Sequence, residues 1–167
     1  HIIALYARAR TGAVFVETGT LHGDTLAAVR SEFTALHSIE LQENLYQAAV
    51  ARFKEDNLVF IHQGDSGEVL KSVLASISDP VVFWLDGHYS GSGTAKGSQD
   101  CPIWRELDAI IIRGNERDIV LVDDARLYGR RVSYPTLKAI EKKLLAAFPN
   151  CTMMLHDDIA CFLLGRL

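Results

Sequence analysis

The chain has 167 residues, of which 49% are hydrophobic and 23% charged, and these values suit one globular domain with a substantial core. Lys and Arg number 17 against 21 Asp and Glu, a net charge of −4, so the chain lacks the basic excess that nucleic-acid binding requires. It also has no apolar run near the roughly 20 residues of a membrane span and no signal-peptide pattern, so we expect one domain over residues 1–167 with neither nucleic acid nor membrane as partner.

Helix and strand signals alternate along the chain. Residues 2–10 predict a short helix that stops near Gly12. Apolar residues three or four positions apart predict five more helices, over residues 24–33, 43–54, 66–77, 102–111 and 137–144. Short apolar runs between them predict strands at Ala13–Glu17, Leu36–Glu40, Leu58–His62, Val81–Leu85, Ile119–Val122, Thr152–Leu155 and Ile159–Leu164.

This alternation predicts an α/β fold. Strands separated by helices pair in parallel, and right-handed crossovers place the helices on both faces of a doubly wound, Rossmann-like sheet. The last two strands are separated by only a tight turn, so they add an antiparallel hairpin at the C-terminal end. We find no internal repeat or interdomain linker, and the missing initial Met suggests that an N-terminal piece is absent.

The three cysteines, Cys101, Cys151 and Cys161, form no CxxC motif. If the terminal hairpin turns at Asp157-Asp158, Cys161 faces Met154 and not Cys151. We therefore expect reduced, buried thiols, as in a cytoplasmic protein.

The exit of the first predicted strand reads Glu17-Thr18-Gly19-Thr20-Leu21-His22-Gly23. Gly19 allows a sharp turn and the close approach of a ligand, and Gly23 removes a side chain where the next helix would crowd the strand. The N-terminus of that helix directs unpaired N–H groups above the sheet. This stretch predicts the opening of a nucleotide-binding βαβ unit, against the alternative of an ordinary strand–turn–helix junction.

Carboxylates follow each of the first five strands. They are Glu17, Glu40, Asp65, Asp86, Asp123 and Asp124. In a doubly wound sheet these strand ends share one edge, where ligands bind. Six acids on one edge repel each other unless cations or hydroxyl donors lie among them, so we expect a binding site there.

The positions of these acids predict different roles. Glu40 lies 23 residues after Glu17, the spacing at which an acid on the second strand takes up the two hydroxyls of a ribose. Asp65-Ser66 lies either beside an adenine ring, or in a plain turn with Ser66 as the cap of the next helix.

Asp86, Asp123 and Asp124 follow neighbouring strands and offer an all-oxygen ligand set for Mg²⁺ or another hard divalent cation. His88, two residues beyond Asp86, is either a general base for a metal-bound hydroxyl or a surface residue.

These motifs together resemble class I S-adenosylmethionine-dependent methyltransferases, and most of all the macrocin O-methyltransferase type, which are metal-dependent enzymes acting on sugar hydroxyls. The resemblance spans Val14 to Leu164 and includes the terminal hairpin. It implies that the cofactor contacts Glu17, Thr18, Gly19, Thr20, Gly23, Glu40, Leu41, Asp65, Ser66 and Asp86. It further implies that Asp86, Asp123 and Asp124 hold the metal. His88 stands where that family has an Asp as general base, and Thr20 replaces a glycine common in class I enzymes.

Two other segments have open interpretations. The glycine-bearing segment 89–100, with Lys96, is either a substrate lid or a surface loop. Arg126, Arg130 and Arg131 either bind an anionic group of the substrate or form a solvated basic loop.

The expected activity is therefore O-methylation of a sugar or another hydroxylated small molecule, with S-adenosylmethionine as cofactor and a divalent metal in assistance. An NAD-dependent oxidoreductase or epimerase needs a Gly-x-Gly-x-x-Gly turn, whereas this chain has only Gly19-x-x-x-Gly23. A cofactor-binding domain without catalysis, used for assembly, is a second alternative, and a homo-oligomer is compatible with each.

Overall fold

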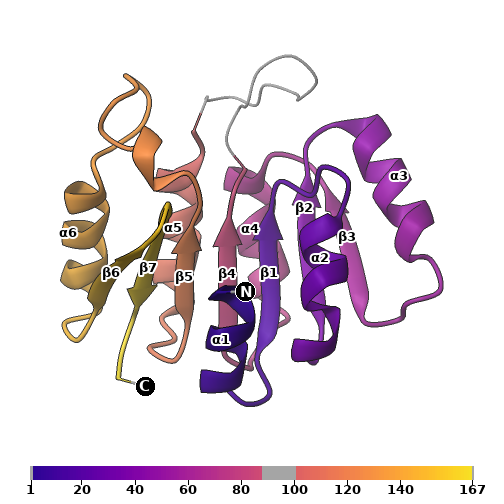
Figure 1. Ribbon diagram of the computed structural model, residues 1–167, viewed down its shortest axis with the longest axis horizontal. Helices are drawn as coiled ribbons and strands as arrows, with labels where there is room; N and C mark the ends of the chain where they lie inside the picture. Colours follow the sequence, from indigo (N-terminus) through magenta and orange to yellow (C-terminus); the bar gives the residue numbers. More distant parts are fainter. Residues whose placement is uncertain (1, 88–100, 167) are drawn as a thin grey trace.

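The computed structural model describes residues 2–87 and 101–166, and in this part of the chain seven strands form one sheet in the order β3-β2-β1-β4-β5-β7-β6 (Figure 1). The first five strands pair in parallel, and β7 pairs antiparallel with both β5 and β6. The strands are β1 (Val14–Thr18), β2 (Leu36–Glu40), β3 (Val59–Gln63), β4 (Val81–Leu85), β5 (Ile119–Val122), β6 (Thr152–His156) and β7 (Ile159–Leu163). The predicted mostly parallel, doubly wound sheet with a C-terminal hairpin is confirmed.

The helices are α1 (Ile2–Ala9), α2 (Asp24–Val29), α3 (Glu43–Phe53), α4 (Ser66–Leu74), α5 (Ile103–Arg113) and α6 (Leu137–Ala147), with short 3₁₀ turns at η1 (Arg30–Glu32) and η2 (Ala125–Leu127). The helix predicted over residues 24–33 is thus shorter and ends in the turn η1. No helix within the described ranges has the length and apolar character that a membrane crossing needs.

Strand β3 begins one residue later than predicted because Asp56 forms a turn before it. Its carboxylate accepts the Leu58 backbone N–H at 3.0 Å, and its carbonyl accepts the Val59 N–H at 3.2 Å. A side chain that bonds the backbone two residues ahead is a turn signal, and it delays the start of the ladder.

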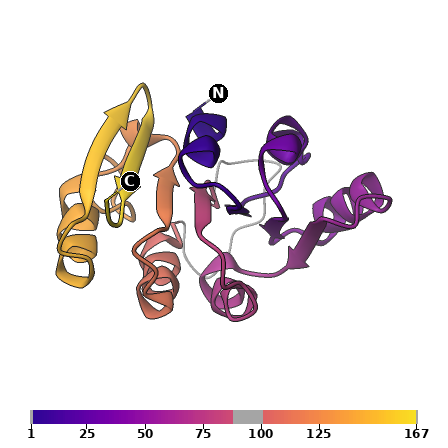
Figure 2. The same ribbon diagram turned by 90° about the horizontal axis from the view of Figure 1, so that it is seen from below.

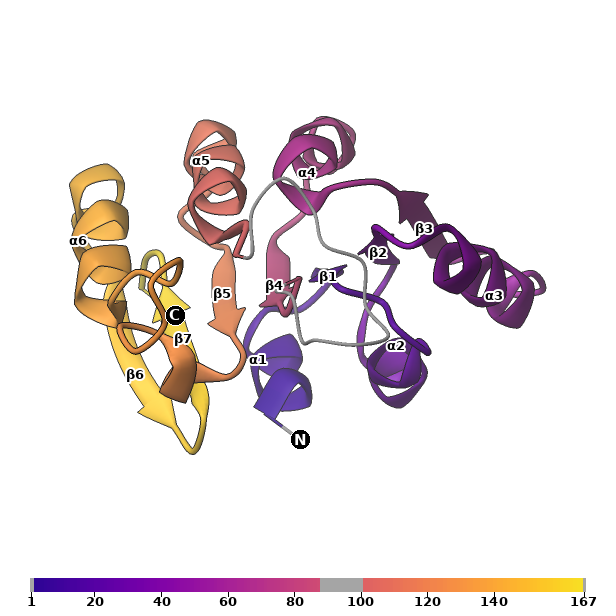
Figure 3. The ribbon, with the colours of Figure 1, turned by 90° about the horizontal axis from the view of Figure 1, so that it is seen from above.

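The helices cover both faces of the sheet, as seen along the strands in Figure 2 and Figure 3. Helices α4, α5 and α6 pack on one face and α1 and α2 on the other. Alternate residues of the central strands enter the two cores: Val16 and Phe83 face the α4–α6 side, and Phe15 and Trp84 face the α1–α2 side. Strands buried on both faces explain the continuous apolar runs in the sequence.

The edge where the parallel strands begin is held by a buried ion pair. Asp118, with no exposed surface, accepts the Val81 N–H at 2.8 Å and the Arg113 Nε–H at 2.8 Å. These bonds tie the start of β4 to the end of α5. This cluster lies at the opposite edge of the sheet from the acids singled out in the sequence.

The terminal hairpin has the predicted register. Met154 of β6 lies opposite Cys161 of β7, and Asp157 in the turn has a left-handed backbone with φ 52°. All three cysteines are buried.

Candidate functional site

The turn after β1 is built around a buried carboxylate. Glu17 is 1% exposed and accepts a hydrogen bond from the Ser38 hydroxyl at 2.7 Å, and the Ser38 oxygen lies 2.6 Å from the Thr20 hydroxyl. This chain of side chains links the ends of β1 and β2. It therefore fixes the turn that leads into α2.

The two glycines of this turn are required by protein packing. Gly19 has φ +85°, and a Cβ there would lie 2.6 Å from the Asp86 carbonyl oxygen, just beyond β4, while the predicted approach of a ligand to Gly19 stays a prediction. Gly23 has φ +75°, and its Cβ would lie 2.7 Å from the Phe53 ring of α3. The crowding partner of Gly23 is thus α3, not the strand as we expected.

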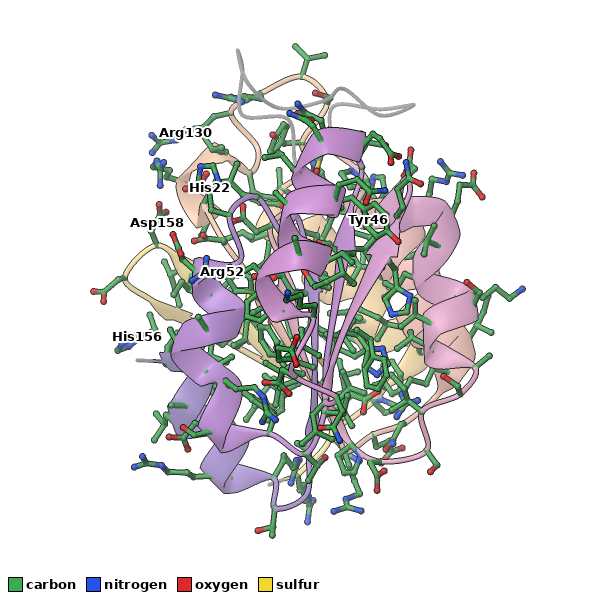
Figure 4. The ribbon with its side chains drawn as sticks, turned by 90° about the vertical axis from the view of Figure 1, so that its right-hand side faces the viewer. His22, Tyr46, Arg52, Arg130, His156 and Asp158 are labelled. Atoms are coloured by element: carbon green, nitrogen blue, oxygen red, sulfur yellow. The ribbon has the colours of Figure 1, made fainter. Side chains whose placement is uncertain are left out.

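The start of α2 is also anchored to α3 by an arginine. Arg52 bonds the carbonyl oxygen of His22 and reaches the Asp24 carboxylate at 2.7 Å, and Figure 4 shows Arg52 beside His22. The turn is therefore held from both sides, by the β2 and β4 strand ends and by α3.

Glu40, at the end of β2, is a buried carboxylate oriented by the backbone. One oxygen accepts the Leu21 N–H at 2.9 Å and the other accepts the Gln42 N–H at 2.8 Å. Each carboxylate oxygen keeps a second lone pair. Glu40 can therefore accept two further hydrogen bonds, such as those from a diol.

The backbone of Leu21 is strained in this turn, because it has φ 49° although the residue is not glycine. Its side chain is 47% exposed. A left-handed conformation costs an L-residue about 1–2 kcal/mol, and Asn tolerates it better. We expect Leu21→Asn to raise the free energy of unfolding by about 0.5–1 kcal/mol. Urea denaturation measures this, and a destabilised variant would show that the Leu21 side chain contributes more than its backbone costs.

Two of the predicted strand-end acids have raised pKa values. Burial, with the charges of Asp86 and Glu40 adding to it, raises the pKa of Glu17 to about 8, against the Ser38 and Thr25 hydrogen bonds. Burial and the neighbouring Asp123 and Asp124 raise the pKa of Asp86 to about 8. Perturbed carboxyl groups gathered at one edge are typical of functional sites.

The turn interpretation of Asp65 and Ser66 named the wrong residue as the helix cap. Asp65, not Ser66, caps α4, since its carboxylate accepts the Gly67 N–H at 3.0 Å. Ser66 is the first residue of the helix, and its hydroxyl donates to Glu106 at 2.6 Å.

Glu106 is the residue of this edge that sequence reasoning missed. It is 1% exposed, and burial raises its pKa to about 7 against hydrogen bonds from Ser66 and Thr18. Its position was a usable signal, because it shares the apolar face of α5 with Ile103 and Ile110, where a charged residue is out of place.

The predicted metal ligands come together at the ends of β4 and β5. The two strands pair directly, and Asp86 lies close enough to Asp123 and Asp124 for their charges to raise its pKa. Asp124 has φ 52°, and its carboxylate pairs with Arg126 at 2.6 Å. Within the described residues no group of three or more His, Cys, Asp and Glu side chains is arranged to hold a metal ion, so the metal site stays a prediction.

His88 and the segment 89–100 lie outside the described residues, so their predicted roles also stay predictions. Of the three arginines after β5, Arg126 is bound by two carboxylates, those of Asp124 and Asp158. Arg131 lies over the Tyr134 ring, 5.6 Å from its centroid. The interpretation of Arg126 as an anion site is not supported by this pairing.

No family model and no curated protein sequence matches the chain. Several solved structures, in contrast, match the chain. The SAH-bound Podospora anserina methyltransferase PaMTH1 superposes with a TM-score of 0.65 at 16% identity, over 96% of this chain and 75% of that one. Human methyltransferase-like protein 13 in complex with SAH gives 0.61 at 15% identity, over 96% and 78%.

An rRNA methylase from Streptococcus thermophilus gives a TM-score of 0.57 at 10% identity, over 99% of this chain and 95% of that one. At such low identities these likenesses establish the fold, which is the methyltransferase form of the Rossmann-like sheet. One of these three proteins is named for an rRNA acceptor and the names of the other two give none, so the fold leaves the methyl acceptor open.

Proposed function

We propose that this protein is an S-adenosylmethionine-dependent methyltransferase that methylates a hydroxyl group of a sugar or another small molecule. The fold and the strand-end acids support the first part of the proposal. The resemblance of the strand-end motifs to the macrocin type supports a hydroxyl group as the methyl acceptor. By the same resemblance, His88 would be the base, and Asp86, Asp123 and Asp124 would be ligands of a divalent metal.

The charge of the site is the observation that supports S-adenosylmethionine as the cofactor. Glu17 and Asp86 are buried carboxyl groups whose pKa values are raised to about 8 by burial and by neighbouring acids. A ligand with net positive charge relieves this repulsion, and S-adenosylmethionine carries a sulfonium and an ammonium against one carboxylate. The pyrophosphate of a nicotinamide dinucleotide adds negative charge instead, so the oxidoreductase alternative is disfavoured.

The polar groups of the site also fit this cofactor. Glu40 would hold the ribose through its remaining lone pairs, and Glu17 would face the cationic methionine part. The Gln42 Oε1 atom is buried and has no hydrogen-bond partner among the described residues, so it suits an N–H donor of the ligand. When bound, S-adenosylmethionine supplies an activated methyl group, and the protein's contribution is to align the acceptor and remove its proton.

Calorimetric titration of S-adenosylmethionine into the protein, with and without Mg²⁺, tests the proposal. We expect saturable binding, weakened about 10–100-fold in Glu40→Gln, because one charge-assisted acceptor is lost. Glu55→Gln is the matched control, since it removes the same charge from a side chain that is 90% exposed and lies just beyond the C-terminal end of α3. A folded protein that binds NADH and no S-adenosylmethionine would overturn the proposal.

A further inference from the structure

Glu106 lies where four elements meet below the carboxyl edge of the sheet. It sits in the first turn of α5, and the Ser66 hydroxyl at the start of α4 donates to its Oε1 at 2.6 Å. The hydroxyl of Thr18, the last residue of β1, also bonds its carboxylate. One buried acid therefore joins β1, α4 and α5.

The Thr18 hydroxyl extends this connection to the end of β4. Its oxygen accepts the backbone N–H of Asp86 at 3.2 Å and that of Gly87 at 3.1 Å. A hydroxyl has two lone pairs and one hydrogen, so with both lone pairs used its hydrogen is left for Glu106. A carboxylate, which only accepts, is the group that satisfies Thr18 and Ser66 together.

Gly87 shows how closely these groups converge. A Cβ at Gly87 would lie 3.0 Å from Thr18 Oγ1 and 3.1 Å from both Glu106 Oε1 and Ser66 Oγ. Three side-chain oxygens thus surround the position that a Cβ of residue 87 would occupy. The backbone after β4 is therefore seated on the cluster of Thr18, Ser66 and Glu106.

We propose that Glu106 is a positioning residue, whose carboxylate fixes the Asp86–Gly87 backbone and the first turn of α4 relative to β1. It acts through Thr18 and Ser66 and need not touch a ligand itself. The consequence for S-adenosylmethionine binding rests on the function proposed above, whereas the effect on the Asp86–Gly87 backbone does not.

Two measurements on Glu106→Gln test this role. Glutamine keeps one acceptor oxygen and replaces the other with an N–H₂ donor, so the two hydroxyls must compete for a single oxygen. We expect hydrogen exchange at the Asp86 and Gly87 amides to become about tenfold faster, and S-adenosylmethionine affinity to fall about tenfold. The exchange rates and the affinity are both measured under conditions in which the variant is fully folded.

Asp118→Asn is the matched control. Asp118 is also a buried acid that accepts a backbone N–H, but it lies at the opposite edge of the sheet. We expect it to lower the unfolding midpoint while leaving ligand affinity and the exchange of the two amides unchanged. Equal effects of both variants on those amides would reduce Glu106 to a general stabiliser and overturn the proposal.

A second variant keeps the test decisive if Glu106→Gln folds poorly. Ser66→Ala removes one donor and leaves the carboxylate, and we expect a smaller acceleration of exchange at Gly87. Unchanged exchange in both variants overturns the positioning role whatever the wild type binds. Faster exchange in Glu106→Gln supports that role even if the wild-type protein fails to bind S-adenosylmethionine, a failure that refutes only the proposed function.

Discussion

Replacing Gly19 with alanine is expected to lower the free energy of unfolding by about 3 kcal/mol or more. Two costs add at this position. The backbone has φ +85°, which disfavours any residue with a Cβ, and that Cβ would lie 2.6 Å from the Asp86 carbonyl oxygen. The contact is with backbone, which cannot rotate away, so β1 and β4 must separate at the edge that carries the candidate site.

Gly12 provides the matched control for this prediction. It also has a left-handed backbone, with φ +78°, but a Cβ there meets nothing within 4 Å. Gly12→Ala should therefore cost only the conformational strain, about 1 kcal/mol. Urea denaturation of both variants separates the two costs, and an equal loss would mean that the β4 end moves away easily.

Much of the architecture could be predicted because its signals are local. The runs Leu36–Glu40, Val81–Leu85 and Ile119–Val122 are strands with the predicted bounds, since a strand buried on both faces reads as an uninterrupted apolar segment. Once the strands and helices alternate, the rules for parallel crossovers leave few possible sheet orders. The acids at the strand ends follow from the same reasoning, because each one lies within the last two residues of a strand or within two residues after it.

The contacts between elements were not predictable in this way. Nothing local in the sequence indicates that Arg126 pairs with Asp158 of the hairpin turn, or that the Asp86 carbonyl oxygen lies where a Cβ of residue 19 would be. Glu106 was missed because it is neither a strand end nor part of a motif. Its role depends on α5 packing beside α4, which brings Ser66 within 2.6 Å.

The stability of the ligand-free protein is expected to fall as the pH rises from about 6.5 to about 8. Burial and neighbouring charges raise the pKa of Glu17 and of Asp86 to about 8, far above the value near 4 in the unfolded chain. In this window the native state binds more protons than the unfolded state, so the free energy of unfolding decreases with pH. Each extra proton contributes about 1.4 kcal/mol per pH unit.

The lower limit of this window is set by two histidines. Burial lowers the pKa of His37 to about 4 and lowers that of His62. Below about pH 6.5 the unfolded chain therefore binds more protons at these positions, which gives the opposite slope. Urea denaturation across the window measures the sum, and Glu17→Gln should flatten the slope and be more stable than the wild type near pH 8.

Ligand binding should follow pH in the opposite direction. A cationic ligand binds the ionised acids, so S-adenosylmethionine affinity should rise below about pH 8 by up to about tenfold per pH unit for each proton released, and level off above it. Calorimetry in buffers of different ionisation enthalpy counts the protons released on binding. An anionic dinucleotide would instead take up protons and bind less tightly as the pH rises, so the sign of this one slope distinguishes the two ligand classes. A wild-type protein whose stability rises with pH in this window would show that Glu17 and Asp86 are ionised without a ligand, and the charge argument for the cofactor would then fail.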